Sequence, residues 1–250
     1  MSSRTLLELE IPVQNKQEIL EQIEKYIKRP SGFFHIVSLN PENIILSRED
    51  KTFRNVIQTA QIKLIDGIGV ILAARILGFR VGERITGVGL MEELMKMAKR
   101  ERLRVLLLGG QGNLALRLAQ CYQILLGQAK IRGIEGIKNI EKPTSVEEKQ
   151  VFSIVTKLKP HMLFVSFGSP QQELWLDRHK SKLQGIVCMG VGGAFDYLAG
   201  KVMRAPHLIR RLGLEWFFRL IAQPRRWRRQ LRLIKFLWLV LLQRYEHKSY

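Results

Sequence analysis

The sequence has few cysteines and no long apolar run. Only two cysteines, Cys121 and Cys188, occur among 250 residues. They exclude a disulfide framework, and we expect both to be buried, reduced thiols of a cytosolic protein. No stretch of about 18 or more apolar residues is present, which argues against a membrane-spanning helix. The first 16 residues lack the apolar segment typical of a secretory signal peptide.

Metal-binding side chains are also scarce. The chain has four aspartates, and none forms an Asp-x-Asp pair. Its five histidines and two cysteines show no spacing typical of metal ligands. We therefore expect neither a metal site nor a cofactor. A bound diphosphate would have to be neutralised by arginines, backbone N–H groups and helix ends.

Positive charge, in contrast, is abundant and unevenly placed. The formal net charge is +19, and residues 201–250 alone carry 13 Lys and Arg against two Glu. Such a basic segment is typical of proteins that bind nucleic acid, anionic lipid or a phosphorylated small molecule.

Strands and helices alternate along residues 1–200. Near-continuous apolar segments predict strands that are buried on both faces, which indicates an α/β, Rossmann-like fold with a largely parallel sheet covered by helices on both faces. Residues 201–250 predict a separate, basic, amphipathic appendage of two helices divided by Pro224. The strands are expected at 5–11, 33–39, 62–66, 104–110, 130–136, 161–168 and 185–193, and the helices between them at 15–27, 40–50, 51–60, 69–78, 87–100, 113–127, 145–159 and 170–183.

Polar and glycine-rich turns follow most of the predicted strands. Ligands bind beyond the carboxyl ends of the strands in open α/β sheets, so these turns predict a single site. The turns are "SLNPEN", "DGIG", "GGQGN", "FGSPQQE" and "GVGGAFD".

Each turn also has a purely structural interpretation. Asp66 is either a general base or the N-cap of the helix that follows it. Asp196 is either an N-cap or a positioning residue. The turn that begins at Gly109 either contacts a phosphate or only joins a strand to a helix, since its spacing departs from the dinucleotide fingerprint. The side chains at 171–173 either cap a helix or recognise a sugar or a base.

Taken together, these segments resemble the WecG/TagA/CpsF family of bacterial glycosyltransferases, glycosyltransferase family 26. The resemblance covers roughly residues 5–230, in family order. It rests on "SLNPENI", "LIDGIGVILAARILG", "ERITGVGLMEELM", "LLLGG", "FVSFGSPQQELW", "GVGGAFDYLAGKVMRAP" and "GLEWFFRLIAQPRRWRR".

The resemblance implies an inverting, metal-independent transfer of a sugar from a UDP-sugar to a polyprenyl-diphosphate-linked saccharide. The product would belong to a cell-wall polymer or an exopolysaccharide, and the donor sugar would be of N-acetylmannosamine type, a hexose or a uronic acid. Asp66 matches the family's proposed base. Gln171 stands where the family usually has a cation, which leaves the identity of the sugar open.

The resemblance also implies the other site residues. Ser38, in place of the usual Thr, together with Asn40, Arg84 and Gln172, matches substrate-binding positions. Gly109, Glu173, Gly192 and Gly193 lie in the glycine-rich turns and are predicted to bind substrate with them. Three arginines match the family's C-terminal pattern and are predicted to bind the diphosphate: Arg219, Arg226 and Arg229.

Residues 225–246 combine cations with a strongly apolar surface. Such a helix is suited to lie on an anionic membrane, so we expect the protein at the inner face of the cell membrane. The alternative is a helix packed on its own domain or on a sister subunit, and a homo-oligomer is left open. A nucleic-acid-binding protein is the main rival, although the basic tail is apolar rather than interleaved with exposed aromatics, so we expect no nucleic acid. A nucleotide-binding oxidoreductase is the third alternative.

Overall fold

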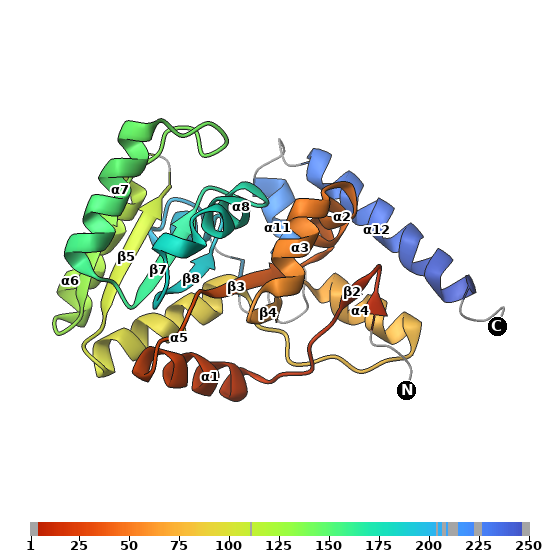
Figure 1. The fold of residues 1–250 in the computed structure, drawn as a ribbon. Coiled ribbons are helices and arrows are strands. Elements are labelled where there is room, and N and C mark those ends of the chain that lie inside the picture. Colours follow the sequence, from red (N-terminus) through yellow and green to blue (C-terminus); the bar gives the residue numbers. More distant parts are fainter. Residues whose placement is uncertain are drawn as a thin grey trace.

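The structure is a computed structural model that describes residues 5–110, 112–203, 205–206, 209, 215–222 and 227–246. Most of it is one six-stranded parallel sheet with helices on both faces (Figure 1), so the predicted α/β class is confirmed. The strands are β1 (Thr5–Leu6), β2 (Leu9–Glu10), β3 (Phe34–Leu39), β4 (Ile62–Ile65), β5 (Arg104–Gly109), β6 (Lys130–Ile134), β7 (Met162–Ser166) and β8 (Val187–Gly190).

The helices alternate with the strands of the sheet, as the sequence predicts. They are α1 (Lys16–Lys28), α2 (Pro41–Glu49), α3 (Lys51–Thr59), α4 (Ile68–Leu77), α5 (Gly87–Arg100), α6 (Leu114–Leu126), α7 (Ser145–Leu158), α8 (Gln171–Arg178), α9 (Ala194–Leu198), α11 (Glu215–Ala222) and α12 (Trp227–Glu246), with a short 3₁₀ turn η1 (Lys180–Lys182).

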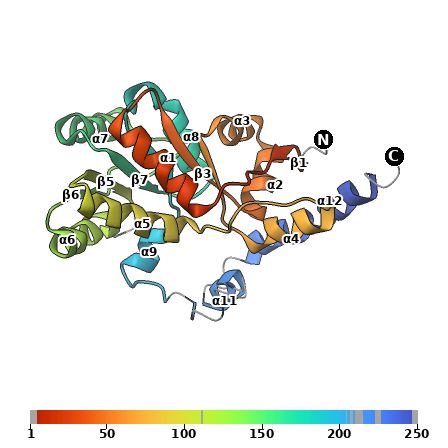
Figure 2. The ribbon, with the colours of Figure 1, turned by 90° about the horizontal axis from the view of Figure 1, so that it is seen from below.

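The strand order in the sheet is β4-β3-β8-β7-β5-β6, and all the pairings are parallel. Successive residues of each strand point to opposite faces of the sheet and are buried against the helices there. Helices α1, α5 and α6 pack against one face, and α7 and α8 against the other. Figure 2, drawn from below, shows α1, α5 and α6 across the first of these faces. Both faces are covered, which explains why the strands are apolar throughout.

The N-terminal segment departs from the prediction. One strand is expected over residues 5–11, but the chain turns back on itself between β1 and β2, where Leu7 and Glu8 have φ of 47° and 73°. Leu6, Leu7, Leu9 and Ile11 are buried. The apolar residues of this segment therefore serve a small hairpin that packs beside the sheet.

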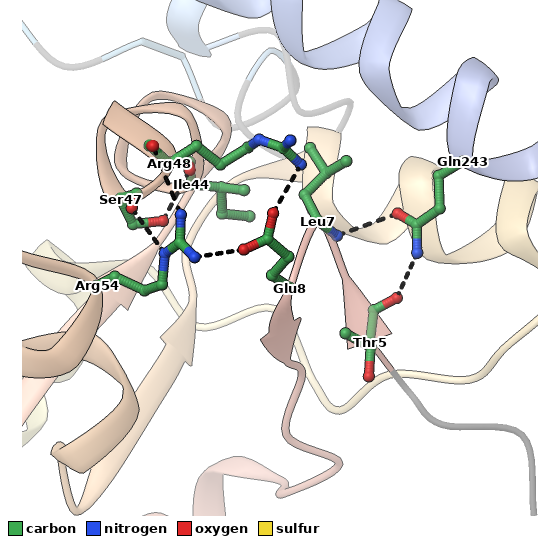
Figure 3. A network of polar contacts seen from close by, with 8 residues as sticks. All are labelled: Thr5, Leu7, Glu8, Ile44, Ser47, Arg48, Arg54 and Gln243. Carbon is green, nitrogen blue, oxygen red and sulfur yellow. Dashed lines mark hydrogen bonds and ion pairs between the residues drawn. The ribbon is translucent and has the colours of Figure 1, made fainter. Parts of the chain in front are cut away.

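The hairpin is tied to both the core and the tail helix. Glu8 forms ion pairs with Arg48 and Arg54 of α2 and α3. Gln243 of α12 accepts a hydrogen bond from the Leu7 N–H at 3.0 Å. Its amide also donates to the Thr5 carbonyl at 2.9 Å, and Figure 3 shows these contacts together. The N-terminal hairpin and the C-terminal helix α12 are thus joined by hydrogen bonds.

The tail helix α12 packs on the core through one face. Phe236 and Val240 are fully buried in a cluster with the hairpin, α2, α3 and α4. Arg232 pairs with Glu42 at 3.0 Å, and Lys235 pairs with Glu49 at 2.6 Å. In Figure 2, α12 runs alongside α4. This face of α12 therefore packs on its own domain, which is the alternative to membrane contact that the sequence left open.

The structure contradicts one smaller prediction, on Cys121, and one of the two interpretations of Asp196. Cys121 lies on the exposed side of α6, whereas Cys188 is buried in β8 as expected. Asp196 is not an N-cap, because α9 begins after Gly193 and Asp196 lies within its first turn. Helix periodicity decides which side of α6 Cys121 occupies, whereas the start of α9 at Ala194 places Asp196 inside that helix.

Candidate active site

A cleft with a volume of about 820 Å³ opens at the carboxyl ends of the strands. Its wall includes the ends of β3, β4, β7 and β8 and the turns that follow them. Helix α2, which follows β3, and helix α9, which follows β8, contribute to different core clusters. The two helices therefore leave toward opposite faces of the sheet. A crevice is expected at such a divergence.

Asp66 lies in this wall, directly after β4. Its backbone N–H donates to the Leu39 carbonyl at 3.0 Å, which extends the pairing of β3 and β4 by one residue. Helix α4 begins after Gly67, and that cap position has no side-chain hydrogen bond. The N-cap interpretation of Asp66 is therefore wrong, and the residue is half-buried in the wall of the cleft.

The glycines of "DGIG" allow α2 and α4 to start side by side. A Cβ on Gly67 would lie 2.9 Å from Pro41 Cδ, and one on Gly69 would lie 2.6 Å from Pro41 Cγ. Both contacts are closer than carbon atoms tolerate. These glycines therefore bring Asp66 next to the start of α2, where Asn40 lies.

Asn40 and Asn43 organise the end of β3. The side chain of Asn40 accepts from the Asn43 N–H at 2.9 Å and caps α2. The buried Asn43 amide then donates to the Ser38 carbonyl at 2.8 Å. A Cβ built on Gly87 would lie 3.4 Å from Ser38 Oγ and 3.7 Å from Asp66 Oδ2. Ser38 and Asp66 thus both approach the first residue of α5.

Arg84 reaches the cleft from the segment between α4 and α5. The Ile85 N–H donates to the Ile65 carbonyl at 2.9 Å, so this segment is attached to the end of β4. Thr86 follows and caps α5 through the Gly89 N–H at 3.1 Å. Arg84 and Thr86 both line the cleft. The arginine was predicted from the resemblance, whereas the capping threonine was not.

Several helices begin at this cleft. The first residues of α2, α4 and α5 line it. Helix N-termini carry partial positive charge and unpaired N–H groups, so together they favour an anion such as a diphosphate. Within the described ranges, no three His, Cys, Asp or Glu side chains gather closely enough to hold a metal ion. The metal-independent mechanism remains a prediction.

The turns after β7 and β8 form the floor of the cleft. Gly192 and Gly193 line it, as do Gln172 and Glu173. Gln172 is only 2% exposed and Glu173 only 1%. Burial is the largest influence on Glu173 and raises the pKa of its carboxyl, which favours the neutral acid.

Gly109 differs from the other predicted glycines. It is buried, and a Cβ there would lie 2.9 Å from the Phe167 ring and from the Ser166 carbonyl oxygen. The neighbouring Gly110 lines the cleft instead. Gly109 thus lets β5 approach β7 closely. The spacing of glycines in the sequence does not distinguish such a packing role from contact with a ligand.

The tail completes the opposite side of the cleft. Trp216 of α11 and Leu233 and Leu237 of α12 line it. Arg226 lies outside the described residues, and so do the side chains of Arg219 and Arg229. Their predicted contact with a diphosphate stays a prediction.

Sequence reasoning missed several polar residues of the site. Among them, Thr86, Asn43 and Lys201 all line the cleft. Thr86 could have been found as a Thr directly before a glycine-started helix. Asn43 sits inside a helix and Lys201 beyond the last strand, and no local pattern indicates that either faces the cleft.

The tail also carries an exposed apolar stripe, which we call the outer stripe. On α12 its members recur every three or four residues, so they share one side of the helix. The stripe comprises Trp227, Leu231, Ile234, Trp238, Leu241 and Tyr245. No described helix is both long enough and apolar enough to cross a membrane.

Comparison with known proteins supports the resemblance over the whole chain. The model of the Glycosyl transferase WecG/TagA/CpsF family matches residues 4–250. A Bacillus subtilis protein is 29% identical over 251 residues, which span 100% of this chain and 95% of that protein. A Bacillus spizizenii protein is 31% identical over 86% of this chain and 81% of its own length. A Staphylococcus aureus protein is 30% identical over 84% of this chain and 80% of its own length.

All three relatives carry the same name, N-acetylglucosaminyldiphosphoundecaprenol N-acetyl-beta-D-mannosaminyltransferase. The match covers nearly every residue and includes both the cleft and the tail. The chain is therefore a glycosyltransferase and belongs to the WecG/TagA/CpsF family.

Proposed function

We propose that this enzyme transfers an N-acetylmannosaminyl group from a UDP-sugar to an N-acetylglucosaminyl-diphosphate-polyprenol at the membrane surface. The names of the relatives supply the acceptor and the sugar. The observation that carries the proposal is the cleft itself, where the Asp66 carboxylate and Ser38 face the start of α5 beneath an apolar tail.

The donor diphosphate is assigned to the positive side of the cleft. The first residues of α2, α4 and α5 line the cleft, as do Arg84 and Lys201. A guanidinium binds phosphate oxygens through two parallel hydrogen bonds and needs no metal as a bridge. Arg219, Arg226 and Arg229 are proposed to complete this binding when the tail lies over the donor.

Asp66 is assigned the role of general base in a single displacement. The acceptor hydroxyl oxygen forms a bond to the anomeric carbon of the donor while the bond from that carbon to the UDP oxygen breaks. Asp66 takes the hydroxyl proton, and UDP leaves with the bonding electron pair. One displacement inverts the anomeric configuration, and a positioned base contributes about 10²–10⁴-fold to the rate.

The apolar tail suits an acceptor whose lipid stays in the bilayer. Leu233 and Leu237 line the cleft, while the outer stripe of the same helix is exposed. Apolar side chains enter the membrane interface, and nearby basic residues are attracted to anionic lipid by about 1 kcal/mol each. We therefore propose peripheral attachment through α11 and α12, with the cleft opening beside the membrane.

A panel of UDP-sugars, each incubated with a short-chain lipid-diphosphate-linked N-acetylglucosamine, tests this function. UDP release and the anomeric configuration of the product are the measurements. We expect the UDP-N-acetylmannosamine reaction to be the fastest, to invert the configuration and to persist with a strong chelator. Retention of configuration would contradict the single displacement. Activity lost on chelation and restored by magnesium would contradict the proposed diphosphate site.

A further inference from the structure

The turns after β7 and β8 are held together by one side chain. Gly168 and Gly192 in these turns have φ of 91° and 50°, a region that favours glycine. Gln172, in the first turn of α8, lies between the two turns. Both turns line the cleft, so the spacing between them shapes the floor on which a substrate would rest.

The amide oxygen of Gln172 accepts three backbone hydrogen bonds. Its donors are the N–H groups of Phe167 at 3.3 Å, Gly168 at 3.0 Å and Gly192 at 3.1 Å. A carbonyl oxygen has two lone pairs, and three donors occupy them fully. The oxygen is therefore committed to the two turns and does not offer an acceptor to a substrate.

Glu173 fixes the orientation of that amide. The Gln172 nitrogen donates to Glu173 Oε1 at 2.7 Å, and Ser169 Oγ donates to the same oxygen at 2.9 Å. A flipped Gln172 amide would point its NH₂ group at three backbone N–H groups and its oxygen at Glu173. Both changes replace attraction by repulsion, so the Glu173 carboxyl selects one of the two amide orientations.

The surroundings are shaped to admit this pair. A Cβ on Gly190 would lie 2.5 Å from the Gln172 amide nitrogen and 2.6 Å from Glu173 Oε1. Ser166, at the end of β7, adds a second link by donating from Oγ to the Gly192 carbonyl at 2.5 Å. The absence of a side chain at Gly190 therefore leaves room for Gln172 and Glu173 under the floor.

We propose that Gln172 and Glu173 are positioning residues that clip the β7 and β8 turns together, so that the backbone of the turns, and not these side chains, contacts the donor. This differs from the substrate-binding role that the resemblance implies for Gln172. The role in donor binding rests on the proposed function, whereas the clip itself is a property of the fold.

Exchanging the residue types at positions 172 and 173 distinguishes a positioning role for Gln172 from direct contact with a substrate. In Gln172→Glu a carboxylate oxygen still accepts the three backbone N–H groups, but the donor to Glu173 is lost. Adding Glu173→Gln restores a donor across the pair in the reverse direction. A clip therefore predicts that the double variant recovers much of what Gln172→Glu loses. If the side chain at position 172 contacts the substrate directly, no recovery is expected, because the double variant still has Glu at that position.

Gln171 provides the matched control. It precedes Gln172, and its amide donates to Glu141 at 2.8 Å, away from the cleft. UDP titration, thermal melting and hydrogen exchange would be measured for Gln171→Ala, Gln172→Ala, Gln172→Glu, Glu173→Gln and the double variant. UDP affinity and exchange require no transfer, so failure of the proposed reaction is distinguishable from failure of the clip.

We expect Gln172→Ala to weaken UDP binding by at least about tenfold, equivalent to 1.4 kcal/mol, and to raise KM for the donor more than it lowers kcat. Exchange should accelerate in residues 166–170 and 190–194. Gln171→Ala, whose partner Glu141 lies away from the cleft, should remain within a few-fold of the parent enzyme. If Gln172→Ala does not fold, recovery of melting temperature and UDP affinity in the double variant supports the clip. Additive losses in the double variant, or unchanged exchange in Gln172→Ala, would overturn it.

Discussion

The two sides of the cleft differ in the chemical character of the residues that line them. The strand side consists of polar side chains and glycine turns at the ends of β3, β4, β7 and β8, and each is fixed by backbone hydrogen bonds to a neighbouring strand. The tail side consists of apolar residues such as Trp216, Leu233 and Leu237 on two helices that follow the sheet in sequence. The strand side is suited to chemistry and the tail side to admitting a lipid-linked substrate.

The largest expected effect lies on the strand side. Asp66→Asn keeps the shape of the side chain but removes its ability to take a proton. We expect turnover to fall by about 10²–10⁴-fold with UDP affinity largely kept, because the base acts on the chemical step. Steady-state kinetics beside UDP titration give both quantities. Near-normal turnover in this variant would remove Asp66 from the mechanism.

The next effect contrasts the two faces of α12. Phe236 is fully buried and Trp238, two residues later, is 59% exposed. Phe236→Ala should cost about 3–5 kcal/mol in the free energy of unfolding, because it leaves a cavity between α12 and the core. Trp238→Ala should stay within about 0.5 kcal/mol. Denaturant unfolding of both variants is the measurement, and equal losses would contradict the packing of α12.

Membrane binding, in contrast to stability, should depend on the exposed face of α12. The double change Ile234→Glu with Trp238→Glu places charges on the outer stripe and removes apolar area worth about 1.5–3 kcal/mol per fully buried side chain. Binding to anionic vesicles should weaken by about tenfold or more, while turnover with a water-soluble acceptor is kept.

The matched control for the outer stripe is Ile124→Glu. Ile124 is also an exposed apolar residue, but it lies on α6 at the other end of the molecule (Figure 1). Co-sedimentation should not distinguish this variant from the parent protein. Equal vesicle binding by the double variant and the parent would exclude the outer stripe from membrane attachment.

The smallest effect concerns the link between the tail and the N-terminal hairpin. Gln243→Ala removes two hydrogen bonds to Thr5 and Leu7, for a loss of about 1 kcal/mol in stability. Donor KM should rise slightly because α12 becomes less firmly held. Gln17→Ala, which removes an exposed bond to Glu21 within α1, is the control for both measurements. An effect of equal size in the control would mean that the link does not position the tail.

Much of the fold could be predicted because parallel strands are buried on both faces and leave a continuous apolar pattern. The position of the cleft followed from the same topology, since polar turns at the carboxyl ends of the strands meet there. The hairpin could not be predicted, because the reversal at Leu7 and Glu8 uses residues that rarely mark turns. The exposure of Cys121 depended on its side of α6, which its neighbours in sequence do not indicate.

The sequence by itself determined the class of fold, the polar turns and the family, because these depend on local periodicity and on residue types in a fixed order. Only the tertiary structure decided what each side chain does. It removed Asp66 from the helix cap, since Gly67 occupies that position. It committed the Gln172 oxygen to three backbone N–H groups from two turns. It also divided α12 into a packed face and an exposed face. Hydrogen bonds and burial join residues that are distant in sequence, so neither can be read from the neighbours of a residue along the chain.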